Sequence, residues 1–204
     1  MEQIKEYEYV DLGLPSGLKW ATMNVGATSE ADYGSYFQWG DIEDKSNSDY
    51  SWESYKYCNG TYKTLTKYCT NSSYGTVDDK TTLEPKDDAA IQIMGGNWRM
   101  PTSNEFQELF DNTTKKWIED YNGSGINGMK FTSNTNGNSI FFPASGYAHS
   151  KGVANRGLGG YYWSSSLHSF YSNSGLSLDF SGGDISPQNC SYRISGFCVR
   201  GVFE

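Results

Sequence analysis

The residues of this chain that could carry out nucleophilic chemistry are few and scattered. It has two histidines, His149 and His168, and both fall in segments rich in Gly, Ser and Tyr. Hydrolytic or nucleophilic catalysis needs a base beside the nucleophile and a third group that orients the base. No motif of that kind surrounds either histidine. The sequence therefore indicates surface histidines and predicts no catalytic residue.

The cysteines do not form a metal-binding pattern. None of the four has the C-x-x-C spacing of a structural zinc site, and two histidines are too few to complete one. We therefore expect no metal and no cofactor. The four are Cys58, Cys69, Cys190 and Cys198. A disulfide between Cys58 and Cys69 would close a polar loop in an oxidising compartment, and free thiols are the favoured alternative.

The charge of the chain disfavours two classes of partner. Its net charge is −8 and its pI is near 4.8, so its field repels nucleic-acid phosphate and anionic lipid. No apolar stretch reaches the roughly 18 residues of a membrane span, and residues 1–10 lack the apolar core of a signal peptide. We expect a soluble chain with no nucleic-acid partner and no direct membrane insertion. An excised leader or a larger parent protein stays open.

Any binding site must be positioned by short strands, turns and two helices. Alternation predicts strands at residues 7–14 and 18–25, joined by a turn. Thr102 as N-cap, with Glu105 three residues later, predicts a helix that carries Phe106, Leu109 and Phe110 on one side. A shorter helix is predicted at 87–94, and later strands are predicted at 129–132, 139–142, 161–165, 175–180 and 197–203.

The order of these elements predicts an α+β fold in a single domain covering residues 1–204. Residues 41–88 lose periodicity and are rich in Ser, Asn, Tyr, Lys and Asp, which is typical of a long surface insertion. In the strand at 175–180, alternation directs Leu176, Leu178 and Phe180 toward the core. It directs Ser177 and Asp179 toward solvent or a ligand.

Four stretches carry a resemblance to a known family: residues 10–21 (VDLGLPSGLKWA), 96–105 (GNWRMPTSNE), 142–147 (FPASGY) with 160–166 (GYYWSSS), and 196–200 (GFCVR). They resemble the C-type-lectin-like domains of Bacteroidetes and phage surface proteins. Relatives of those domains include the formylglycine-generating-enzyme-like domains and the variable proteins of diversity-generating retroelements. The resemblance implies a C-type-lectin-like fold with two helices, antiparallel strands and long ordered loops.

Most residues of these motifs have structural roles as their simplest interpretation. We expect Trp98 and Trp163 to be buried, and Arg99 to pair with a carboxylate. We expect Arg200 to be buried with its donors satisfied.

The sequence differs from the patterns that two related kinds of protein use for their activities. Formylglycine-generating enzymes use a pair of closely spaced cysteines, and the nearest pair here is Cys190 and Cys198. An oxidase of that type stays as an alternative. Calcium-dependent lectins have an acidic-Pro-Asn or Gln-Pro-Asp loop, whereas residues 186–189 read SPQN and lack the carboxylates that calcium prefers.

The end of the chain has an unusual composition. Lys, Glu, Met, Gln and Trp make up 39 of the 204 residues, but residues 164–203 contain one of them, Gln188. Adenine-directed mutagenesis of Asn-type codons, as in retroelement variable proteins, cannot produce these five types. The alternative is an ordinary Ser- and Tyr-rich strand-and-turn region.

Such a composition also matches the contact loops of antibodies, where Tyr supplies contact area and Ser and Asn adapt their hydrogen bonds. We therefore expect residues 161–203 to face a protein or glycan on a cell or phage-host surface, with the domain extracellular, on a cell surface or on a virion. A structural module of a fimbrial or adhesin assembly is a further alternative. The expected contact residues are His168, Phe170, Tyr171, Asn173, Ser177, Asp179, Ser181, Asp184, Asn189, Ser191, Tyr192 and Arg193.

Overall fold

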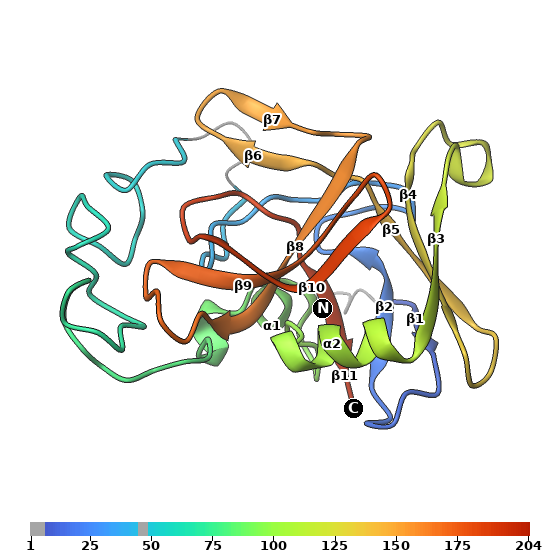
Figure 1. Cartoon of the computed structure of the whole chain (residues 1–204), viewed down its shortest axis with the longest axis horizontal. Helices are drawn as coiled ribbons and strands as arrows, with labels where there is room; N and C mark the ends of the chain where they lie inside the picture. The colour runs from blue at the N-terminus through green and yellow to red at the C-terminus, as the bar shows by residue number, and fades with distance from the viewer. Residues whose placement is uncertain (1–6, 45–48) are drawn as a thin grey trace, which may run out of the picture.

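The computed structural model describes residues 7–44 and 49–204. Within them the chain is α+β and rich in strands, which confirms the predicted class (Figure 1). The helices are α1 (Ala89–Met94) and α2 (Ser103–Asp111), with 3-10 turns at Pro85–Asp87 and Tyr121–Gly123. The strands are β1 (Tyr9–Asp11), β2 (Lys19–Asn24), β3 (Thr113–Ile118), β4 (Gly128–Ser133), β5 (Ser139–Pro143), β6 (Tyr147–His149), β7 (Gly152–Ala154), β8 (Gly159–Leu167), β9 (Ser174–Ser181), β10 (Asp184–Tyr192) and β11 (Arg200–Phe203).

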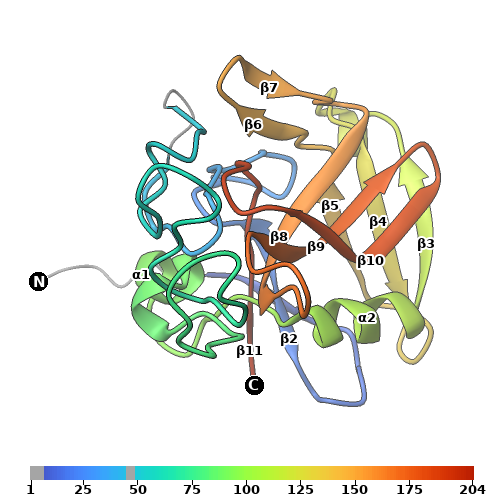
Figure 2. The same cartoon turned by 60° about the vertical axis from the view of Figure 1, so that its left-hand side comes forward.

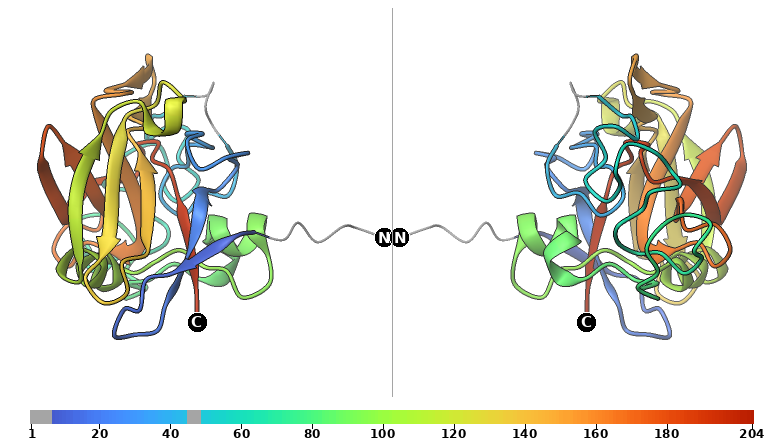
Figure 3. Two further views of the ribbon diagram at one scale, coloured as in Figure 1. Left: turned by 90° about the vertical axis from the view of Figure 1, so that its right-hand side faces the viewer. Right: turned by 90° about the vertical axis from the view of Figure 1, so that its left-hand side faces the viewer.

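One sheet joins the beginning of the described chain to its end. Its order is β1-β2-β11, with Val202 paired to Trp20 across β11 and β2 (Figure 3). Arg200 begins β11 and is fully buried, as expected. Trp98, by contrast, is only half-buried and packs edge-on against Phe203 at 4.7 Å, because it covers the outside of this sheet.

The predicted capping box at the start of α2 is confirmed. The hydroxyl of Thr102 accepts from the backbone N–H of Glu105, and the Glu105 carboxylate accepts from the N–H of Thr102. The same carboxylate receives two hydrogen bonds from Arg99, at 2.7 and 2.8 Å. The motif around Pro101 therefore fixes where α2 begins, and α2 packs on β8, β9 and β10.

The main core lies between α2 and two antiparallel sheets of order β3-β4-β5 and β10-β9-β8 (Figure 2). Leu178 and Phe180 of β9 point into it, whereas Leu176 is half-buried. Trp163 is fully buried in a second, adjoining core. Gly175 of β9 has no room for a side chain, because the ring of Trp39 packs against it. The nearest ring atom would lie 2.6 Å from an added Cβ.

The sequence analysis did not predict four of the strands, β3, β6, β7 and β10. The polar strand β3 follows α2 directly, and β6 and β7 form a hairpin in a segment that is rich in Gly. Strand β10 contains Pro187, which removes a backbone donor and lies where the pairing with β9 shifts register. Proline is tolerated at such an edge strand or bulge, so the turn-like composition of 182–192 was misleading.

The insertion at residues 41–88 is only partly a surface loop. Its described part runs beside β9 (Figure 1), and Tyr55, Leu65 and Tyr68 are almost completely buried. Residues 45–48 of the insertion, and residues 1–6 on which the signal-peptide expectation partly rests, lie outside the described residues. Across 7–44 and 49–204, no helix is long and apolar enough to cross a membrane.

Candidate functional site

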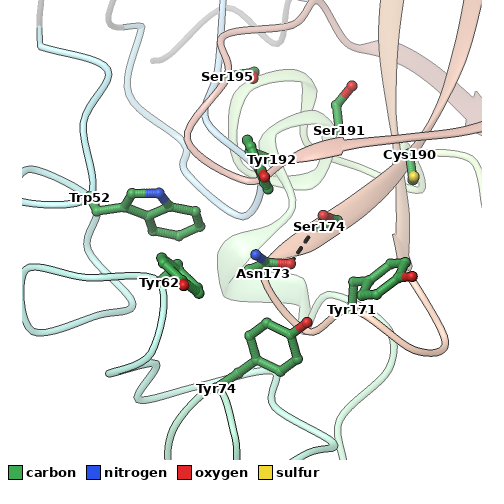
Figure 4. A pocket seen from close by; sticks show the side chains of 10 residues that line it. All are labelled: Trp52, Tyr62, Tyr74, Tyr171, Asn173, Ser174, Cys190, Ser191, Tyr192 and Ser195. Carbon is green, nitrogen blue, oxygen red and sulfur yellow. Dashed lines mark hydrogen bonds between the residues drawn. The ribbon is translucent and has the colours of Figure 1, made fainter.

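A pocket of about 880 Å³ lies between the insertion and the end of the chain. Trp52, Tyr62 and Tyr74 line it from the insertion, and Tyr171 and Tyr192 line it from the C-terminal segment (Figure 4). The remaining lining residues are small or polar: Asn173, Ser174, Cys190, Ser191 and Ser195. The pocket therefore has two walls that are about a hundred residues apart in sequence.

The aromatic rings follow one another around the pocket. The ring centroid of Trp52 lies 6.3 Å from that of Tyr192 and 6.3 Å from that of Tyr62, and Tyr62 lies 6.5 Å from Tyr74. The planes of these pairs are tilted by 55° to 71°. Because rings so tilted cover little of one another's faces, these pairs leave π-faces open to a ligand. The ammonium group of Lys63 lies over the ring of Tyr62, 5.6 Å from its centroid.

The polar groups of the pocket are mostly unused by the protein. The side-chain oxygen of Asn173 accepts from the hydroxyl of Ser174 at 3.2 Å, and its amide nitrogen points into the pocket (Figure 4). Within the described part of the chain, that nitrogen has no hydrogen-bond partner. The same holds for the side-chain hydroxyls of Tyr62, Tyr74, Tyr171, Tyr192, Ser191 and Ser195 and for the indole N–H of Trp52.

Arg193 supports the pocket from behind, and its predicted place on the surface is wrong. The side chain is fully buried. It donates to the hydroxyl of Tyr55 at 2.8 Å and to three backbone oxygens, those of Lys67 (3.1 Å), Tyr68 (3.1 Å) and Ser172 (2.8 Å). The guanidinium is buried because these acceptors satisfy it. It thereby ties the insertion to the C-terminal segment.

A second anchor of the insertion is a buried carboxylate at its end. Asp87 accepts hydrogen bonds from Lys67, Tyr57 and Tyr68, the last at 2.6 Å. Burial alone would raise the pKa of Asp87, but these three donors outweigh it and lower the pKa to about 2. The carboxylate is therefore charged at neutral pH and holds the insertion against the entry to α1.

Alternation directs Ser177 and Asp179 toward solvent or a ligand, and the part of this expectation that concerns solvent is wrong. Both are buried, because their neighbours in β8 on the same face are the large rings of Trp163 and Tyr161. Asp179 accepts from Ser177 at 2.7 Å and from Asn189 of β10. Burial raises the pKa of Asp179 to about 6, against the lowering effect of these two hydrogen bonds.

Asp179 forms the wall of a second, smaller hollow of about 270 Å³ at the other end of β9 and β10. Two other predicted contact residues, Ser181 and Asp184, line it as well. Its full lining is Tyr161, Asp179, Phe180, Ser181, Asp184, Ile185 and Ser186.

His168 is half-buried and holds the loop that carries Tyr171. Its Nδ1 atom accepts from the backbone N–H groups of Phe170 and Tyr171, both at 3.1 Å. Its ring stacks on that of Tyr171, with centroids 4.9 Å apart and planes 23° apart. Phe170 remains 75% exposed beside the pocket. Of the twelve predicted residues, the structure thus brings four into the large pocket: Tyr171, Asn173, Ser191 and Tyr192.

The prediction from sequence missed the wall formed by Trp52, Tyr62 and Tyr74. A signal was present, because residues 50–74 contain seven aromatic side chains among Ser, Thr and Asn. The C-terminal segment has a similar composition, which there predicts a contact surface. In the insertion, the lack of periodicity favoured a surface loop instead.

Thiols and carboxylates form no obvious reaction centre in the part of the chain that the structure describes. There, no three His, Cys, Asp or Glu side chains are grouped to hold a metal ion, and all four cysteines are free thiols. Cys190 is exposed at the pocket, whereas Cys198 is buried and donates to the backbone oxygen of Tyr33. Burial raises the pKa of Cys198 to about 12, so its reactive thiolate is suppressed at neutral pH.

Comparison of the chain with protein-family models, curated proteins and solved structures finds no match in any of the three. The main features of the candidate site are a concave surface of aromatic rings, unpaired polar groups and the hydrogen-bonded support behind them.

Proposed function

We propose that this chain is a non-enzymatic ligand-binding domain of the receptor or adhesin type, and that its ligand occupies the pocket between the insertion and the C-terminal segment. The observation that carries the proposal is the lining itself, in which five aromatic side chains surround polar groups that the protein leaves unpaired. Tyrosine and tryptophan dominate the energetics of recognition surfaces, since they offer large contact areas for few rotatable bonds.

Rigidity of both walls further supports binding. Arg193 and Asp87 fasten the insertion from within, and His168 holds the loop of Tyr171. A pocket ordered before the ligand arrives loses less conformational entropy on binding. We therefore expect the aromatic residues to contribute affinity without contributing much to folding.

We further propose a C-type-lectin-like fold for the domain and display on a cell surface or phage virion. Two helices, antiparallel sheets and long ordered loops accord with that fold. So do the burial of Trp163 and Arg200 and the pairing of Arg99 with Glu105. Retroelement diversification of residues 164–203 is part of the same proposal, and a near-identical copy of this coding segment in neighbouring DNA, differing only at adenines, would support it.

The binding proposal is tested with an array that carries both glycans and cell-envelope proteins. The variants Tyr171→Ala and Tyr192→Ala should lose binding to the spots that the unmodified domain recognises, with melting temperatures changed by less than about 2 °C. Tyr9→Ala is the matched control, because Tyr9 is also more than half exposed but lies in β1. Absence of any recognised spot, or equal binding by all three variants, would contradict the proposal.

A further inference from the structure

The chemistry of the pocket narrows the ligand class. We propose that it binds a neutral oligosaccharide, which stacks on Trp52 and the neighbouring tyrosines without a bridging metal ion. This inference rests on the proposed function and specifies its ligand. It is carried by three independent properties of the pocket: its lack of charge, the arrangement of its rings and its unpaired hydrogen-bonding groups.

The lining contains no Asp, Glu, Lys, Arg or His. A charged ligand that entered would give up hydration and find no opposite charge among the lining residues, which is costly in a partly desolvated site. The lining also offers no carboxylate to a calcium ion, whose coordination shell of six to eight oxygens is usually built on Asp and Glu. The pocket therefore favours a neutral ligand that makes its own contacts with the protein.

The ring arrangement suits an extended ligand with apolar faces. The chain of rings from Tyr192 through Trp52 and Tyr62 to Tyr74 spans both walls, with neighbouring centroids 6.3 to 6.5 Å apart. A pyranose ring has a face of C–H groups that carry slight positive charge, and the face of an aromatic ring is negative. Successive sugar units can thus lie on successive rings.

The edge of a sugar is lined with hydroxyls, each of which can donate and accept. The pocket presents matching groups, above all the Asn173 amide, which is 8% exposed and aimed inward. An apolar ligand would cover this amide and leave it without a partner, which costs the free energy of its desolvation. The pocket volume of about 880 Å³ also lies within the range of about 300–1,000 Å³ that is usual for small-molecule sites.

Titration calorimetry on the full chain tests this inference, with cellotriose, maltotriose, xylotriose and mannotriose as neutral probes and EDTA in the buffer. At least one probe should bind saturably. Trp52→Ala should weaken that binding about tenfold or more, because it removes both a ring contact and the apolar area that the ring buries. Trp52→Phe, which keeps a ring, should recover most of the affinity. Phe170→Ala should change nothing, because Phe170 is exposed outside the lining.

The results separate this inference from the proposed function. If none of the four sugars binds at about 10 mM, tenfold above a weak Kd of about 1 mM, but an array protein is captured through Trp52 and Tyr192, the ligand is a protein. The saccharide inference then fails and the binding function stands. If neither sugars nor array spots bind, both fail. Saccharide binding that Trp52→Ala leaves unchanged, or that EDTA abolishes, would also overturn the inference.

Discussion

Two regions of this molecule are each held by a fully buried arginine that lies on an aromatic face. Arg200 serves the terminal sheet and stacks 4.5 Å from the ring of Phe142, and Arg193 serves the insertion and stacks 4.9 Å from the ring of Trp39. Arg200 takes its acceptors from Asn24 and from the backbone of β2 and β5: Asn24, Ala21, Thr22 and Phe141. Arg193 takes most of its acceptors from irregular loops.

The difference lies in what each arginine adds. Around Arg200 the strands are already paired by their own ladder, so the guanidinium connects two sheets of the scaffold. Around Arg193 the loop carbonyls have no ladder, and the guanidinium itself satisfies them. Loss of Arg200 should therefore affect the whole fold, whereas loss of Arg193 should act mainly on the insertion and the pocket.

The largest effect is expected for Arg200→Met. Four buried acceptors would lose their donor, at about 1–3 kcal/mol each, and the free energy of unfolding should fall by more than about 5 kcal/mol. Burial lowers the pKa of Arg200 to about 10, so the charge is still present at neutral pH. Urea denaturation followed by circular dichroism measures the loss. A variant as stable as the unmodified protein would show that Arg200 does not connect the sheets.

Arg193→Met should cost less, about 3–4 kcal/mol, because water can reach the loop carbonyls once the insertion loosens. The change should appear first as local opening. Trypsin should then cleave at Lys56 and Lys63, two exposed lysines of the insertion, before the domain unfolds. Arg156→Met is the control, since Arg156 is exposed and donates to the Tyr36 hydroxyl outside the insertion. Equal cleavage rates in the two variants would show that Arg193 does not hold the insertion in place.

The pH dependence of stability that Asp179 causes tests whether the β9–β10 pair belongs to the scaffold. Its pKa is raised to about 6, so its protonated form is favoured on folding, and this contribution to stability is complete below pH 4 and lost as the pH rises through 6. Relative to Asp179→Asn, the unmodified protein should lose up to about 3 kcal/mol of unfolding free energy between pH 4 and pH 7.5. The difference between the two proteins cancels the titration of other groups. If the difference in unfolding free energy between the two proteins stays constant from pH 4 to pH 7.5, Asp179 is not buried in the scaffold.

The smallest effect is expected for Thr102→Ala, which removes the N-cap of α2. Such caps contribute about 1 kcal/mol, and the loss should appear in global melting because α2 packs on the scaffold sheet. Thr76→Ala, at an exposed threonine of the insertion, should leave the melting temperature unchanged. A larger effect at Thr76 than at Thr102 would reverse the roles assigned to the two regions.

The scaffold was predictable from the sequence to a greater extent than the pocket. The capping box at Thr102 and the burial of Arg200 follow from local rules or from motif resemblance, and both were found. Ser177 and Asp179 could not be placed by alternation, because alternation does not reveal how large the neighbours on the next strand are. The burial of Arg193 could not be predicted from local sequence, because three of its four acceptors belong to residues more than a hundred positions earlier.

Gly175 sets a limit on how the pocket could be redesigned. It lies between the pocket residues Ser174 and Tyr171 on one side and the core on the other, and the Trp39 ring leaves no space for any side chain there. A library that randomises residues 164–203 would consequently lose most members to misfolding at this position, at Arg193 and at Arg200. One that holds these three constant and varies Tyr171, Ser191 and Tyr192 would change one wall of the pocket against an unchanged opposite wall, which is a practical starting point for selecting new specificities.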